Sequence, residues 1–305
     1  MKINLKVLAK VAVNIFICLL ILSSCKSTNN IQIKYFTDYV KYFETEVSPV
    51  KGIVITAHGL NTNPSKMGDD NTDGTLVKLF LKEGYNVYRI VLPGHGGTIE
   101  EMQNINANDW LNSAYLQYQE AAEIARKNNL PIYLAAFSLG ALVYTNLIHN
   151  NDVIFSKIIL FAPAIAIKGI ARTGIFTADI FLSDKSIIKS IAPIEYQAQK
   201  GVSISAYKAL FELENNLYKS EFANCNIPAL IFINPKDELI NISKLRKIIS
   251  NFNLSNWNIE TVTNTKTEFA SAEITPTYHH LIIDDKCVSP AAWNIIREKI
   301  INFLE

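Results

Sequence analysis

Runs of aliphatic and β-branched residues alternate with stretches of helical periodicity along most of the chain. The run GIVIT, from Gly52, is typical of a strand covered on both faces, because it has no polar side. Further strands are expected in YNVYRIVLPGHG (85–96), PIYLAAF (131–137), KIILFAPAI (157–165), IPALIFIN (227–234) and NIETVT (258–263). Apolar residues at helical spacing predict helices near 75–83, at 108–129, from 139, at 242–251 and at 290–304. Such alternation predicts an α/β fold with a mostly parallel, doubly wound sheet.

Two segments depart from this alternation. Residues 31–47, IQIKYFTDYVKYFETEV, alternate apolar and polar positions and predict a two-stranded antiparallel start. Residues 166–226 contain no clear strand, and a structureless loop of that length is uncommon inside a compact domain. Short amphipathic helices are expected there instead, in IFTADIFL, KSIIKSIA and ISAYKALFELENNLYKS. We therefore expect one domain over 26–305, with a helical cap at about 166–226, here called the cap segment, inserted before a late strand.

The first 25 residues have the layout of a secretory signal peptide. Lysines precede the apolar stretch Val11–Leu22, which is too short to span a bilayer. The sequence LSSC, Leu22–Cys25, resembles a bacterial lipobox, which implies that Cys25 is lipidated and anchors the mature chain to a membrane. A plain signal peptide or an uncleaved anchor is the alternative. Lys26 follows the cysteine, and resemblance to enterobacterial sorting favours the periplasmic face of the outer membrane over the inner membrane.

Composition narrows the possible partners. The chain has 305 residues and a formal charge of +1, enough length for one large α/β domain. A nucleic-acid partner is not expected, because it requires a basic face or stripe that this sequence lacks. Outside the signal peptide the cysteines are Cys225 and Cys287; they could form a disulfide, but two separate buried side chains are favoured. No metal-ligand spacing occurs, so neither metal nor cofactor is expected, and the sequence does not indicate an oligomeric state.

A small polar cluster, Ala136-Phe137-Ser138-Leu139-Gly140, interrupts an apolar run between a predicted strand and a predicted helix. A nucleophilic serine on a tight strand-to-helix turn needs small residues two positions before and after it. Ala136 and Gly140 meet this need, although the usual pattern has glycine at the first position. The pattern alone is weak, but its place between strand and helix is the context that the motif requires. Ser138 is therefore a candidate nucleophile.

The loops that follow other strands carry further candidates, since ligands of parallel sheets bind beyond the carboxyl ends of the strands. In AHGL, Gly59 allows a close approach of the backbone, so the N–H of Leu60 could form an oxyanion hole with the N–H of Leu139. His58 in the same loop is interpreted as a structural histidine in a turn, because it comes too early in the chain to be the base.

An acid and a base are expected after the later strands. Asp237, in PKDELI, could orient a histidine, and Glu238 is its neighbouring rival. In TYHHLIID, either His279 or His280 could accept the proton of the serine. The order of serine, acid and histidine along the chain is that of the α/β-hydrolase architecture.

The motifs HGL, LPGHG, AFSLG, PKDELI and YHHLIID together resemble the α/β-hydrolase superfamily over roughly Gly52 to Leu304. They are most similar to its capped group of monoacylglycerol lipases, lysophospholipases and serine-aminopeptidase-like carboxylesterases. This resemblance implies Ser138 as nucleophile, Asp237 as acid and His279 as base, with His95 in a structural turn and the oxyanion hole at Leu60 and Leu139. His279 is preferred to His280 because, in related carboxylesterases, the histidine precedes an apolar stretch that ends in aspartate.

Two departures from the family pattern concern the acid and the base. Asn234 replaces the commoner glycine before the acid, and the insertion TKTEFASAEITPT lengthens the connection to the histidines. The second departure affects the placement of the base.

The resemblance implies hydrolysis of carboxylic esters through an acyl-enzyme. Apolar residues in the cap segment and a lipid tether favour lysophospholipid or monoacylglycerol as the substrate. An amidase or aminopeptidase would use the same residues and would need acidic cap residues for a substrate amine, for which Asp179, Asp184, Glu195, Glu212 and Glu214 are available. A third possibility is a non-catalytic binding or structural lipoprotein of the cell envelope.

Overall fold

The computed structural model describes residues 40–263 and 279–305, apart from the side chains of residues 176–181. The signal peptide with its lipobox, part of the segment 31–47 and the insertion at 265–277 lie outside the described residues. Within the described residues, no helix is long and apolar enough to cross a membrane. The same residues contain no group of histidine, cysteine, aspartate and glutamate side chains that could hold a metal ion.

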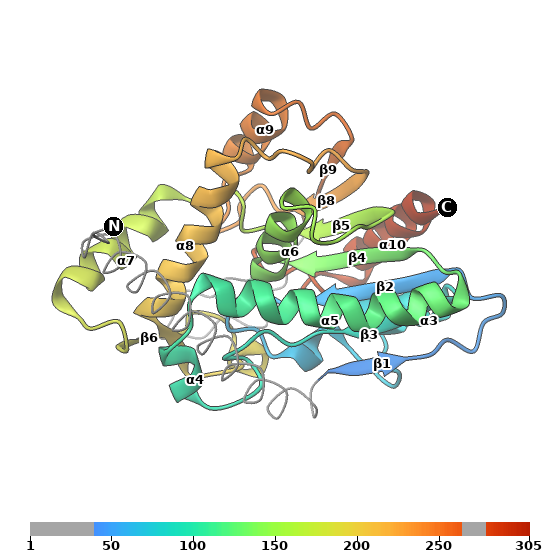
Figure 1. The fold of residues 1–305 in the computed structure, drawn as a ribbon, viewed down its shortest axis with the longest axis horizontal. Coiled ribbons are helices and arrows are strands. Elements are labelled where there is room, and N and C mark those ends of the chain that lie inside the picture. Colours follow the sequence, from blue (N-terminus) through green and yellow to red (C-terminus); the bar gives the residue numbers. More distant parts are fainter. Residues whose placement is uncertain (1–39, 264–278) are drawn as a thin grey trace, which may run out of the picture. The chain divides into compact units, whose positions relative to one another are not determined.

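A seven-stranded sheet forms the centre of the domain, in the order β1-β3-β2-β4-β5-β8-β9 (Figure 1). Its strands are β1 (Lys41–Phe43), β2 (Gly52–Ala57), β3 (Tyr85–Arg89), β4 (Ile132–Phe137), β5 (Lys157–Phe161), β8 (Ala229–Ile233) and β9 (Trp257–Thr261). Only β1 runs antiparallel to its neighbour β3, and all other pairs are parallel. The predicted mostly parallel α/β sheet is confirmed, although β3 and β5 end earlier than their apolar runs suggested.

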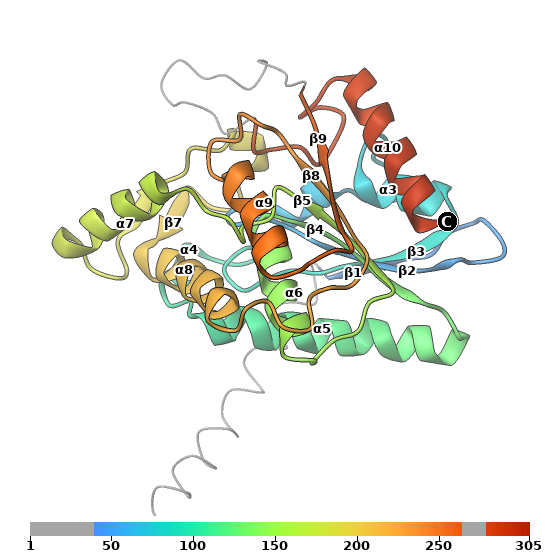
Figure 2. The same ribbon diagram turned by 90° about the horizontal axis from the view of Figure 1, so that it is seen from above.

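Helices on both faces explain why the central strands are buried along their length. Every residue of β2, β3 and β8 is buried, as expected for strands without a solvent face. Helices α3 and α10 lie on one side of the sheet, and α5 and α6 lie on the other (Figure 2). The helices of the main body are α3 (Leu76–Lys82), α4 (Ile99–Gln103), α5 (Ala107–Asn128), α6 (Leu139–His149), α9 (Ile242–Asn251) and α10 (Pro290–Leu304), with a 3-10 turn η1 (Pro64–Met67). The predicted limits of the long helices agree within one residue.

The path of the chain through the sheet creates a crevice at β2. After β2 the chain moves outward to β3, and it then crosses back to β4 on the other side of β2. The loops after β2 and β4 therefore leave the sheet in opposite directions, and such a switch point is where ligands bind in open α/β sheets. Ala57 and Ala136 are partners at the ends of these two strands. The loops that follow them contain Leu60 and Ser138.

The cap segment lies beyond the carboxyl ends of the parallel strands (Figure 1). Its elements are α7 (Gly169–Phe181), β6 (Ile187–Lys189), η2 (Ile194–Tyr196), β7 (Gly201–Ser203) and α8 (Ile204–Lys219). The prediction of a helix in KSIIKSIA was wrong, because β6 pairs with β7 in a small antiparallel sheet. The β-branched pair Ile187-Ile188 suits a strand, and a Cβ at Gly201 would lie 2.3 Å from the carbonyl oxygen of Ile188. Glycine at 201 thus allows the two strands to approach.

The two cysteines of the described part are buried and free. Cys225 and Cys287 are therefore separate core side chains, as favoured from the sequence, and they form no disulfide with each other.

Candidate active site

Ser138 lies on the turn between β4 and α6, in a backbone conformation that few residues adopt. Its φ of 48° and ψ of −107° are strained for a residue with a side chain. The turn is held by the Ser138 N–H, which donates to the carbonyl of Phe161 at 2.9 Å. A Cβ at Gly140 would lie 2.8 Å from the carbonyl oxygens of both Ala57 and His58. Glycine at this position is therefore what lets α6 begin so close to β2, as the sequence motif required.

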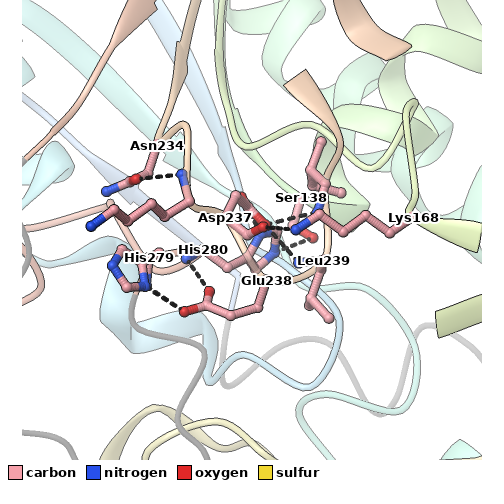
Figure 3. Close-up of polar contacts among 10 residues, drawn as sticks. Ser138, Lys168, Asn234, Asp237, Glu238, Leu239, His279 and His280 are labelled. Atoms are coloured by element: carbon pink, nitrogen blue, oxygen red, sulfur yellow. Dashed lines mark hydrogen bonds and ion pairs between the residues drawn. The ribbon is translucent and has the colours of Figure 1, made fainter. Parts of the chain in front are cut away.

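Ser138, His280 and Asp237 form a hydrogen-bonded chain (Figure 3). The Oγ of Ser138 lies 3.0 Å from His280 Nε2, and His280 Nδ1 lies 2.9 Å from Asp237 Oδ2. The other carboxylate oxygen of Asp237 accepts hydrogen bonds of 2.8 Å from the N–H groups of Leu239 and Ile240. Asp237 is fully buried, and the His280 side chain is 7% exposed. The three groups are thus fixed in the order that base-assisted nucleophilic attack requires.

The expectation that His279 faces Ser138 was wrong. His279 Nδ1 lies 2.6 Å from Glu238 Oε1, so its ring is bound to the neighbouring carboxylate and His280 occupies the place beside the serine. Phe137 contacts the His280 ring, with 5.0 Å between ring centroids. The two histidines are adjacent in the chain, so the backbone conformation of this turn determines which of the two rings lies beside Ser138. We call residues 279–284, which carry both histidines, the base loop.

Leu60 and Leu139 flank Ser138 from two different elements. Leu139 is the first residue of α6, where an N–H has no acceptor within the helix. Leu60 follows β2 and lines the same pocket as Ser138. The loop after Leu60 is fixed by the cap segment, since Asn61 Oδ1 accepts from the Gln199 N–H at 2.8 Å and Asn61 Nδ2 donates to the Gln199 carbonyl at 3.0 Å. The placement of both leucines is compatible with the predicted oxyanion hole, which stays a prediction.

His58 and His95 are buried, and they support the loop that carries Leu60. The N–H of Asn61 donates to His95 Nε2 at 2.9 Å, and the N–H of Leu92 donates to His58 Nε2 at 3.0 Å. Burial lowers the pKa of His95 to about 4 and, reinforced by the nearby His95, lowers the pKa of His58 well below its usual value. Both rings are therefore neutral near pH 7, as hydrogen-bond acceptors must be. The structural interpretation of both histidines is confirmed.

An apolar pocket of about 300 Å³ lies beside the serine. Ser138 and His280 belong to its wall, so the reactive groups face its interior. Most of the remaining wall is aliphatic or aromatic and comes from both the main body and the cap segment, including Ile167, Ile175, Ile191, Phe211 and Leu239. Pockets of this kind take apolar ligands that a few polar groups orient.

Comparison with known proteins identifies the fold. The family model of serine aminopeptidases, S33, matches residues 48–184. Monoglyceride lipase from Saccharomyces cerevisiae, as a soluble variant in complex with a substrate analogue, superposes with a TM-score of 0.68 at 12% identity, covering 87% of this chain and 90% of that one. The chain has an α/β-hydrolase fold.

Two further solved structures superpose over nearly the same range. A structure of the metagenome-derived lipolytic enzymes LipS and LipT gives a TM-score of 0.64 at 19% identity, covering 87% of this chain and 96% of that one. The monoacylglycerol lipase of Paleococcus ferrophilus gives 0.58 at 15% identity, with 87% and 97% covered. No curated protein matches the sequence significantly.

The contacts of Glu238 were not foreseen from the sequence. The structure brings its carboxylate against the base loop instead of leaving it as a rival acid. A signal was present, because two adjacent carboxylates, Asp237 and Glu238, are matched by two adjacent histidines. The sequence alone did not say which carboxylate takes which histidine.

Proposed function

We propose that this α/β-hydrolase is a serine hydrolase that cleaves carboxylic esters with an apolar acyl chain. The observation that carries the proposal is the hydrogen-bonded chain from Ser138 through His280 to Asp237, placed on the wall of an apolar pocket. A nucleophile, a base and a group that orients the base are the parts required for acyl transfer. The similar structures of lipolytic enzymes and monoglyceride lipases fit the same proposal.

In the proposed mechanism, Ser138 Oγ attacks the ester carbonyl carbon while His280 Nε2 takes the hydroxyl proton. The carbonyl oxygen becomes an oxyanion, which accepts hydrogen bonds from the N–H groups of Leu60 and Leu139. Asp237 holds the ring of His280 and stabilises its positive charge. His280 then donates the proton to the leaving alcohol, and the acyl group stays on Ser138.

Water completes the reaction by the same route. His280 takes a proton from a water molecule, which attacks the acyl-enzyme carbonyl. Collapse of the second oxyanion breaks the bond to Ser138 Oγ, which recovers its proton from His280. The products are a carboxylic acid and the free enzyme, so the cycle needs no cofactor.

Lysophospholipids, monoacylglycerols and similar acyl esters are the proposed substrate class. The pocket walls offer apolar contact along an acyl chain, whose burial is favourable by about 0.8 kcal/mol for each CH₂ group. The residues of the cap segment that form part of this wall include Ile188, Ala192 and Val202.

An amidase or aminopeptidase is the second candidate, supported by the family model of serine aminopeptidases. Recognition of a substrate amine would need a carboxylate at the pocket. Asp184 pairs with Lys208, the buried Glu214 pairs with Arg172 and Lys244, and Glu195 and Glu212 are exposed. None of these four carboxylates is among the described residues of the pocket wall. Asp179 belongs to the side chains outside the described part. The lack of these four carboxylates in the described wall supports the ester proposal over an amine-binding site.

Covalent labelling tests the proposal against a non-catalytic envelope lipoprotein. A fluorophosphonate probe is expected to label Ser138, as located by peptide mass spectrometry, and p-nitrophenyl esters are expected to be cleaved faster than aminoacyl p-nitroanilides. A series of esters from short to long chain, with lysophospholipid alongside, then measures the acyl preference. Absence of labelling would exclude the serine hydrolase, and faster cleavage of the amides would favour the second candidate.

We also propose that Cys25 carries a lipid that holds the enzyme at the bacterial envelope, beside its lipid substrates. Cys25→Ser is expected to abolish incorporation of radiolabelled palmitate and to release the protein from the membrane fraction, because acyl chains supply the anchoring free energy. Cys18→Ser is the matched control, since this cysteine lies in the signal peptide and its loss should leave the lipid in place. Lipid retained after Cys25→Ser would contradict the proposal.

A further inference from the structure

Glu238 contacts the base loop through three hydrogen bonds. Its Oε2 accepts from the main-chain N–H of His280 at 3.0 Å. Its Oε1 accepts from the main-chain N–H of His279 at 3.3 Å and lies 2.6 Å from His279 Nδ1 (Figure 3). The side chains of Glu238 and His279 are 23% and 18% exposed, so the pair is largely screened from water. The carboxylate is thus turned against the loop and not into solvent.

Adjacent carboxylates therefore hold the same histidine at two points. Asp237 binds the imidazole ring of His280 at 2.9 Å, while Glu238 binds its main chain. A contact to the ring fixes its tautomer and rotation. A contact to the main chain fixes the position of the backbone from which the side chain extends. Together they define both the position and the orientation of Nε2, and small misplacements of a catalytic group are costly.

The rest of the base loop is anchored on the other side of His280. Leu281, Ile282 and Ile283 are buried, and Asp284 accepts a hydrogen bond from the hydroxyl of Tyr196 in the cap segment at 2.8 Å. On the N-terminal side of His280, Glu238 binds the loop through the main-chain N–H groups of His279 and His280 and through the ring of His279. The loop is thus held by contacts on both sides of His280.

We infer that Glu238, together with His279, is a positioning residue for the base His280. This inference rests on the proposed function of Ser138, His280 and Asp237. The Glu238–His279 pair keeps Nε2 within hydrogen-bond distance of the serine and takes no proton from the substrate. Neither member is among the described residues of the pocket wall, so the pair affects the rate of the chemical steps and leaves the binding of substrate unchanged.

The test compares the wild type with Glu238→Ala, His279→Ala, the double variant and Glu238→Gln, using a soluble p-nitrophenyl ester and the full chain. Active sites are counted by complete reaction with a fluorophosphonate, so that unfolded molecules do not enter kcat. For Glu238→Ala and His279→Ala we expect kcat per active site to fall about 10- to 100-fold with KM unchanged. Glu238→Gln keeps an oxygen that can accept from the His280 N–H and should recover much of the loss. The double variant should lose no more than Glu238→Ala, because the two side chains act as one unit.

Glu123→Ala is the matched control, because it removes a carboxylate that pairs with Arg126 and Lys127 on the surface of α5; its kcat should equal that of the wild type. An unchanged kcat per active site in Glu238→Ala, or a rise in KM that accounts for the loss, would overturn the inference. Should Glu238→Ala not fold, His279→Ala decides by the same criteria. A wild type that does not react at Ser138 would overturn the proposed function, whereas an active wild type with unaffected variants overturns the inference alone.

Discussion

Ser138→Ala should lower kcat for ester hydrolysis by about 10⁴- to 10⁶-fold, to the level of residual catalysis by the rest of the site. Without Oγ the acyl-enzyme cannot form, and neither His280 nor the oxyanion hole can replace the bond that is lost. The fold should survive, because alanine is smaller and this structure already places an alanine, Ala162, at a positive φ of 41°. The measurement is p-nitrophenyl ester hydrolysis, with circular dichroism and the thermal midpoint as checks on folding.

Ser113→Ala provides the matched control for this experiment. Ser113 is another buried serine, on α5, where its Oγ accepts a hydrogen bond from Gln117 at 3.0 Å. Its loss should cost some stability and leave kcat close to that of the wild type. Ester hydrolysis that persists in Ser138→Ala, at the wild-type rate and on the same substrate, would refute the assignment of the nucleophile.

The strands of the sheet could be predicted because burial on both faces requires a nearly continuous run of apolar residues. Strands such as β2 have no solvent-facing side, so their mostly apolar runs can be recognised without knowledge of their neighbours. Strand order is decided by packing between distant segments, and the sequence pattern does not contain it. The error at β6 has a similar cause, since the stretch around Ile187 becomes a strand only through its pairing with β7.

The part of the site that depends on local backbone geometry, the turn at Ser138, could be predicted from the sequence. The elbow at Ser138 needs small neighbours, and the close approach of Gly140 to β2 gives that need a physical reason. The choice between His279 and His280 depends on contacts with Glu238, in the loop after β8, and with Phe137, at the end of β4. A likeness to a family motif that ends in aspartate selected the wrong neighbour, because motif spacing does not report which way a ring turns.

Alanine substitution of His280 and of His279 should lower kcat by amounts that differ by orders of magnitude. His280→Ala is expected to lower kcat by about 10⁴-fold or more, because Ser138 would lose the only described group within 3.0 Å that can take its proton. His279→Ala should cost about 10- to 100-fold, the loss expected when a base is present but poorly held. Both variants are measured with the same soluble ester, and labelling by the fluorophosphonate should be far slower in His280→Ala.

If His279→Ala lowered kcat more than His280→Ala, the roles of base and positioning residue would have to be exchanged. If His279→Ala were the more damaging change, the ring of His279 would have to reach Ser138 during catalysis, and its bond to Glu238 would have to break. Glu238→Ala would then free His279 and raise kcat, whereas the positioning role proposed here requires kcat to fall. The effect of Glu238→Ala on kcat thus has opposite signs under the two assignments, and this sign decides between them without any comparison of absolute rates.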